Sequence, residues 1–75
     1  MHKSEAMELL KDIIASCPAL ALSGFYTRDI RSSPKNDVEL RLLASLDKDS
    51  RRTLDPLIAN RGLKLIEESG LLIIY

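Results

Sequence analysis

The segment from Leu71 to Tyr75 constrains this chain most, because its five residues are all apolar or aromatic and none is charged. Gly70 precedes it, and the isoleucine and tyrosine side chains within it favour an extended strand. A lone strand leaves its backbone N–H and C=O groups unpaired. The segment therefore needs a neighbouring strand, supplied either by this chain or by a second copy of it.

The length of the chain limits how a core can be stabilised. Its 75 residues predict a single small domain over 1–75. A core of this size rarely contributes more than about 3–5 kcal/mol, so small domains are often helped by disulfides, metals or oligomerisation. One Cys and one His exclude an internal disulfide and a structural zinc site. Oligomerisation or unusually efficient packing remains as the source of added stability. We expect no metal and no cofactor, and we predict a homodimer.

The composition is that of a folded domain, with 45% hydrophobic and 29% charged residues. Eleven basic residues balance eleven acidic ones, so net charge gives no attraction to nucleic acid or anionic lipid. The uncharged stretch 13–27 is too short and too polar to span a bilayer, and the start lacks a signal-peptide pattern. We expect a cytoplasmic protein without a membrane partner, in which a lone thiol stays reduced.

A first helix over Ser4–Ser16, with Ser4 as its N-cap, is predicted from apolar residues at helical spacing, namely Ala6, Met7, Leu9, Leu10, Ile13 and Ile14. The helix is expected to end before Pro18, since the residue that precedes a proline is driven out of the helical region. Residues 19–26 are apolar with weak alternation, so they form either a short strand or an irregular core segment.

A loop and a second helix are predicted next. Residues 27–37 are rich in turn formers, and the strongest of these are Ser32, Ser33, Pro34, Asn36 and Asp37. A helix over 37–47 is predicted because Val38, Leu42 and Leu46 lie on one helical stripe. The polar run that follows is either a tight connector or the first turn of a third helix, capped by Asp49 or Ser50.

Two interpretations remain for the rest of the chain. In the first, one helix runs over 56–69, tolerates Gly62 and stops at Gly70. In the second, Gly62 ends the helix and residues 63–75 form a β-hairpin with Gly70 in its turn. Good helix formers over 63–68 favour the first. Both interpretations keep Leu71 to Tyr75 as a strand.

These elements predict an α-rich α+β domain with three to four short helices and a small C-terminal strand pair. The order of helix, short strand, helix, short helix, helix and strand, with the ending LIEESGLL, resembles that of a winged-helix domain. The resemblance implies a nucleic-acid-binding fold. Pro56 departs from the pattern, because it falls where the recognition helix of that family is uninterrupted.

The sequence carries no motif for catalysis. It has no glycine-rich phosphate loop, no nucleophile elbow and no metal-binding pair. Cys17 follows the negative end of a helix, which disfavours a thiolate, so we interpret it as a small core residue. We therefore predict no catalytic residues, no enzyme activity and no small-molecule substrate.

Charge distribution suggests one possible site. Residues 28–64 hold nine basic and six acidic residues, an excess of three. Basic side chains at a helix start can bind phosphate, and the candidates for nucleic-acid contact are Arg51, Arg52, Arg61 and Lys64. Scattered surface charge explains the same pattern, and we favour that explanation. Two nearby aromatics are expected to be buried, Phe25 in the core and Tyr26 in part.

The leading functional prediction is a small non-enzymatic interaction or regulatory module that self-associates. A strand with apolar side chains on both faces is typical of one that is covered on both sides. A short chain has few elements for this, so a second copy is expected to provide the missing layer. The predicted self-association residues are Leu71, Leu72, Ile73 and Ile74. The alternative is a winged-helix-like nucleic-acid-binding domain.

Overall fold

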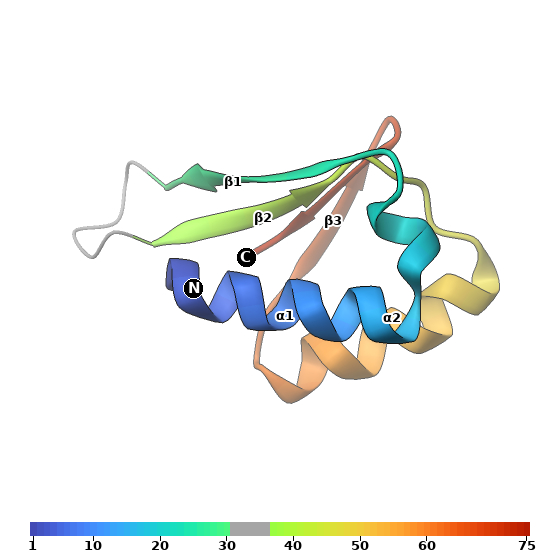
Figure 1. Cartoon of the computed structure of the whole chain (residues 1–75), viewed down its shortest axis with the longest axis horizontal. Helices are drawn as coiled ribbons and strands as arrows, with labels where there is room; N and C mark the ends of the chain where they lie inside the picture. Colours follow the sequence, from blue (N-terminus) through green and yellow to red (C-terminus); the bar gives the residue numbers. More distant parts are fainter. Residues whose placement is uncertain (31–36) are drawn as a thin grey trace.

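A computed structural model of the chain describes residues 1–30 and 37–75. Two α-helices lie side by side along one side of a four-stranded antiparallel sheet (Figure 1). The elements in chain order are α1 (Lys3–Ser16), the 3₁₀ helix η1 (Pro18–Ala21), β1 (Phe25–Asp29), β2 (Val38–Leu42), α2 (Lys48–Asn60), β3 (Leu65–Glu68) and β4 (Leu71–Ile74). The α+β class is confirmed, whereas three to four helices overstates the two α-helices of the described residues.

The segment Leu71 to Tyr75 is paired on both sides within the chain. The strand order is β1-β2-β4-β3, so β4 is a central strand and is antiparallel to both neighbours. Tyr75 extends the ladder by exchanging backbone hydrogen bonds of 2.7 and 3.0 Å with Lys64. The predicted strand is confirmed, and its backbone needs no second copy of the chain.

The hairpin interpretation of residues 63–75 is correct, and the single helix over 56–69 is wrong. Gly62 has a φ of 67° and ends α2 in a Schellman motif, in which Leu63 N–H donates to the Ile58 carbonyl at 3.1 Å. Ser69 and Gly70 both have positive φ, as the type I′ turn of a tight hairpin requires. These two turn sites outweigh the helix propensity of the residues between them.

The predicted helix over 37–47 is wrong, because residues 38–42 form β2. Val38, Leu40 and Leu42 are buried and alternate with the partly buried Glu39 and Arg41, which is the period of a strand. In a helix, Leu40 would point away from the stripe of Val38, Leu42 and Leu46, so the helical pattern did not account for it. With a strand here the order becomes α-β-β-α-β-β, so the described chain lacks the helix that the winged-helix resemblance required at this point.

The helix starts differ from those predicted. The N-cap of α1 is His2, without a side-chain hydrogen bond, rather than Ser4. The N-cap of α2 is Asp47, whose carboxylate accepts the Ser50 N–H at 2.7 Å, rather than Asp49 or Ser50. Pro56 lies inside α2 instead of starting a helix, so that helix lacks one backbone hydrogen bond.

The predicted segments around β1 are confirmed only in part. Residues 18–21 form η1 rather than a strand, and β1 begins after Gly24, whose φ is 117°. The predicted loop over 27–37 is wrong at its start, because β1 continues to Asp29. The strongest loop formers, Ser32, Ser33, Pro34 and Asn36, lie outside the described residues.

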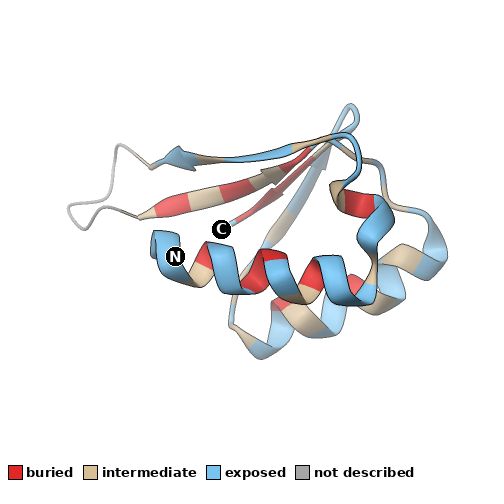
Figure 2. Cartoon of the chain, in the orientation of Figure 1, coloured by how far each residue is buried: buried red, intermediate tan, exposed pale blue. Residues whose placement is uncertain are grey.

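The core lies between the helices and one face of the sheet (Figure 2). Its most deeply buried large side chains are Leu9, Ile13, Leu40, Leu42, Leu54, Leu72 and Ile74. The predicted apolar face of α1 is confirmed at Leu9 and Ile13, while Ile14 lies outside the core. In the described part of the chain, no helix is long and apolar enough to cross a membrane.

Candidate interaction surface

The sheet presents one of its faces without a helix over it in the described residues. Side chains alternate between the two faces of a strand, and Leu40, Leu42, Leu72 and Ile74 all point into the core beneath the helices. The residues between them therefore point the opposite way. We call this side of the sheet the open face.

Strand register arranges the open face in three rows across the sheet, each written from β1 to β3. The central row is Tyr26, Arg41, Ile73 and Ile66. Extending the same register by two residues along the strands gives a row on each side. One flanking row is Arg28, Glu39, Tyr75 and Lys64, and the other is Gly24, Leu43, Leu71 and Glu68.

Exposed apolar and aromatic side chains are spread across the open face. Four large side chains of the face are substantially exposed, namely Tyr26, Leu43, Ile66 and Tyr75. Ile73 lies among them but is only 7% exposed, with Arg41 and Ile66 on the neighbouring strands. Contiguous exposed apolar residues with charged residues around them are typical of interaction sites.

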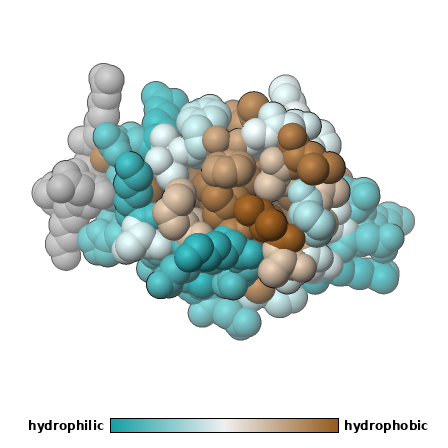
Figure 3. All heavy atoms as spheres, in the orientation of Figure 1, coloured by the Kyte–Doolittle hydropathy of each residue, from teal (hydrophilic) through white to brown (hydrophobic). Residues whose placement is uncertain are grey.

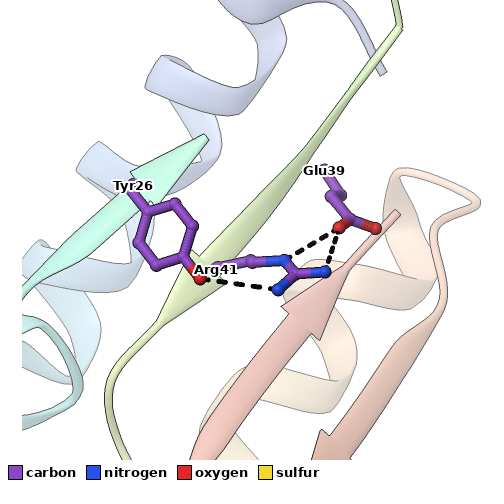
Figure 4. A network of polar contacts seen from close by, with 3 residues as sticks. All are labelled: Tyr26, Glu39 and Arg41. Atoms are coloured by element: carbon purple, nitrogen blue, oxygen red, sulfur yellow. Dashed lines mark hydrogen bonds and ion pairs between the residues drawn. The ribbon is translucent and has the colours of Figure 1, made fainter. Parts of the chain in front are cut away.

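A polar network of Tyr26, Glu39 and Arg41 lies on the β1–β2 side of the open face (Figure 4). The Nε of Arg41 donates to Oε1 of Glu39 at 2.8 Å, and another guanidinium nitrogen donates to the Tyr26 hydroxyl at 3.4 Å. The guanidinium also lies 5.9 Å from the Tyr26 ring centroid, within range of a cation–π contact. The hydrogen bonds to Tyr26 and then to Glu39 raise the pKa of Arg41, so this residue stays charged.

The four predicted self-association residues point to opposite faces of the sheet. Leu72 and Ile74 are fully buried in the core, and Leu71 and Ile73 lie on the open face. The sequence analysis did not identify Ile66 as a surface residue. The hairpin interpretation could have identified it, because alternation along a strand places Lys64, Ile66 and Glu68 together on one face of β3.

The four predicted nucleic-acid-binding residues do not form one patch. Arg51 and Arg52 are exposed near the start of α2. Arg61 follows the opposite end of that helix, about 15 Å away at 1.5 Å per residue, and its guanidinium contacts Oδ2 of Asp12 at 2.9 Å. Lys64 lies on the open face, beside Tyr75.

A second group of exposed apolar residues lies on the other side of the sheet. Phe25 and Tyr26 are both exposed, so their expected burial is wrong. Phe25 belongs to the helix side of β1, and the rest of this group is Met7, Ile14 and Leu22. Seen from the α1 side, apolar residues gather across the middle of the molecule (Figure 3).

Groups with chemical reactivity are few in the described residues. Cys17 is half-buried against the core, and its Sγ lies 3.5 Å from the Ser50 hydroxyl, to which it can donate. This packing agrees with its interpretation as a small core residue. Within 1–30 and 37–75, no three His, Cys, Asp or Glu residues are grouped as metal ligands would be.

Comparison with models of protein families, with curated proteins and with solved structures finds no match for this chain. The geometry of the open face is therefore the basis for a functional proposal.

Proposed function

We propose that this chain is a small non-enzymatic interaction module that self-associates through the open face of its sheet. One observation carries the proposal: the open face is rich in exposed apolar residues, and no described helix covers it. An antiparallel sheet with one solvated face usually has polar residues on that face. Here Leu43, Ile66 and Tyr75 take the positions where polar residues are expected.

A second copy of the chain is the simplest partner for this face. The inner side of β4 is covered by the helices, and its outer side carries Leu71 and Ile73. Two-fold pairing of identical surfaces is the commonest way in which proteins bury such a face. Leu71 then contributes directly, and Ile73, which is only 7% exposed, supports its neighbours on the face. Leu72 and Ile74 hold the strand in place from the core.

The size of the face predicts a weak, reversible dimer. Four strands about 4.8 Å apart, with five residues of about 3.3 Å each, give a flat area of about 300 Å². Stable complexes bury about 800 Å² per partner. We therefore expect a dissociation constant in the micromolar range or weaker, which suits a regulatory contact that responds to concentration.

Two substitutions of exposed isoleucines test this proposal. Ile66 is 39% exposed on the open face, and Ile14 is 43% exposed on α1. We expect Ile66→Lys to shift the mass measured by sedimentation from dimer toward monomer, because it places a charge in the contact. Ile14→Lys is the matched control and should sediment like the parent. A parent with the mass of one chain at every concentration would refute the proposal, as would a dimer unaffected by Ile66→Lys.

The alternative proposal is nucleic-acid binding, supported by the exposure of Arg51 and Arg52 at the start of α2. The Asp47 carboxylate caps this helix end, so the two arginine side chains themselves would contact the phosphates. Binding to labelled duplex DNA should then fall steeply as salt rises and should weaken in an Arg51→Ala, Arg52→Ala double variant. Absence of binding by the parent at low salt would remove this alternative.

A further inference from the structure

We infer that two copies of the chain meet face to face about a two-fold axis that crosses the strands at the row of Ile73 and Ile66, and that Lys64 and Glu68 select this arrangement. The inference rests on the proposed function and names the contacts of the same open face. The partner is a second copy of this chain.

The proposed contacts follow from the side chains that the β3–β4 hairpin places on the open face. Leu63 and Leu65 pack against the core, so Lys64, Ile66 and Glu68 point to the open face from alternate positions. On β4 the same three rows hold Tyr75, Ile73 and Leu71. Each strand thus has an isoleucine at the centre and two different residues at equal spacings from it.

An axis across the strands places each strand over its own copy with the rows reversed. Lys64 then faces Glu68 of the partner subunit, and the same pair forms a second time by symmetry. Tyr75 faces Leu71 of the partner subunit. Each residue of the central row meets its own copy, so Ile66 faces Ile66 of the partner subunit and Arg41 faces Arg41 of the partner subunit. Packed sheets lie about 10 Å apart with their strands within about 30° of each other, which is within reach of a lysine and a glutamate together.

The other way of stacking the two faces is disfavoured by charge. An axis along the strands places β3 over β1 and β4 over β2. Lys64 then faces Arg28 of the partner subunit, and Ile73 faces the partner's Arg41. Like charges in contact and an apolar side chain against a charged one both oppose association. The first arrangement sets two complementary Lys64–Glu68 pairs against one contact between like-charged Arg41 residues, and each Arg41 is already paired with Glu39 of its own chain. The second arrangement has two like-charge contacts and no directly opposed complementary pair, so charge favours the first.

Edge-to-edge pairing of β3 with its own copy is a second competitor, because it also sets Lys64 opposite Glu68. β3 is a short edge strand with Glu67 and Glu68 at its end, features that protect an edge from pairing. The two arrangements differ in one distance. Paired edges bring the two Ile66 Cα atoms to about 4.5–5.5 Å, whereas stacked faces leave about 10 Å, too far for a disulfide.

Charge exchange at positions 64 and 68 tests the inference. We expect K64E and E68K each to weaken the dimer about tenfold in sedimentation, because each creates two like-charge contacts. The double variant K64E/E68K restores both pairs and should bind within about threefold of the parent. An equimolar mixture of K64E and E68K should form a heterodimer tighter than either variant alone, since both pairs are then complementary.

The outcomes separate this inference from the proposed function. A parent that does not dimerise refutes both. A parent that dimerises, with single variants of unchanged affinity, refutes the assigned contacts and leaves self-association intact. An Ile66→Cys variant in a Cys17→Ala background completes the test. Under oxidation it should stay free of disulfide-linked dimer, and efficient cross-linking would overturn the stacked arrangement in favour of edge pairing.

Discussion

Ile13 and Ile14 are consecutive residues of α1 with opposite environments. Ile13 is fully buried in the core, and Ile14 is 43% exposed. Neighbouring helix positions differ by about 100° in direction, so one residue can face the sheet while the next faces solvent. The sequence placed both on one apolar stripe. Composition and periodicity alone did not identify the edge of that stripe, because the edge depends on where the sheet ends.

This difference gives a prediction for stability. Ile13→Ala should lower the free energy of unfolding by about 2–5 kcal/mol, since it leaves a cavity in the core. Ile14→Ala, the control, should change it by about 0.5 kcal/mol or less. Urea denaturation measures both, and an Ile13→Ala variant that is already unfolded without denaturant agrees with the larger loss. Equal effects of the two substitutions would show that α1 docks with a different face.

Asp47 predicts a pH dependence. The Ser50 N–H that its carboxylate accepts at 2.7 Å favours the ionised form and lowers the pKa of Asp47 below its ordinary value of 3.8. A lowered pKa in the folded state stabilises the fold above pH 3.8, and this contribution is lost as pH falls through the folded-state value. Asp47→Asn keeps an acceptor but cannot titrate there.

We therefore expect the stability difference between the parent and Asp47→Asn to be constant from about pH 7 to about pH 5, and to move in favour of the variant below that range. Thermal denaturation at a series of pH values measures this difference. A difference that stays the same down to about pH 2 would mean that Asp47 does not cap α2 in solution.

At the scale of elements, the β3–β4 hairpin shows what local sequence can and cannot determine. The Ser69–Gly70 turn and Gly62 are local signals, and they were sufficient for the hairpin interpretation. The assignment of β2 failed for another reason. Its alternation of Val38, Leu40 and Leu42 competes with a helical stripe over the same residues, and only pairing with β1 and β4 decides between them.

The turn of this hairpin gives a third prediction. Gly70 has a φ of 79°, and no atom lies near the position of an added Cβ, so the cost of Gly70→Ala comes from backbone strain alone. We expect a loss of about 1 kcal/mol in unfolding free energy. Ser69→Asn should have the opposite sign, because asparagine suits the first position of a type I′ turn. If Gly70→Ala is neutral in urea denaturation, the turn has another conformation in solution.

The central position of β4 gives a fourth prediction. Deletion of residues 71–75 removes the strand that joins β2 to β3, along with Leu72 and Ile74 from the core. The truncated chain should be unfolded, as judged by circular dichroism and by loss of amide protection from exchange. A truncated chain that keeps a cooperative unfolding transition would contradict the strand order.

At the scale of the whole molecule, the candidate surface could be predicted from sequence only in part. Apolar residues on both sides of the last strand predicted a covered strand, and two of the residues named for this reason, Leu71 and Ile73, lie on the open face. Tyr26 and Ile66 join the same face only through strand order, which brings β1 and β3 to opposite edges of one sheet. Pairings between distant segments of this kind leave little trace in local residue patterns.

The central claim is that the open face joins two copies of the chain. Backbone amide NMR spectra recorded on dilution from about 1 mM to about 10 µM test it directly, since this range spans weak dimers. We predict concentration-dependent shifts that are largest on the open face, at Ile66, Leu71, Ile73 and Tyr75. Spectra that do not change over this range, or shifts centred on Met7 and Ile14 of α1, would contradict the claim.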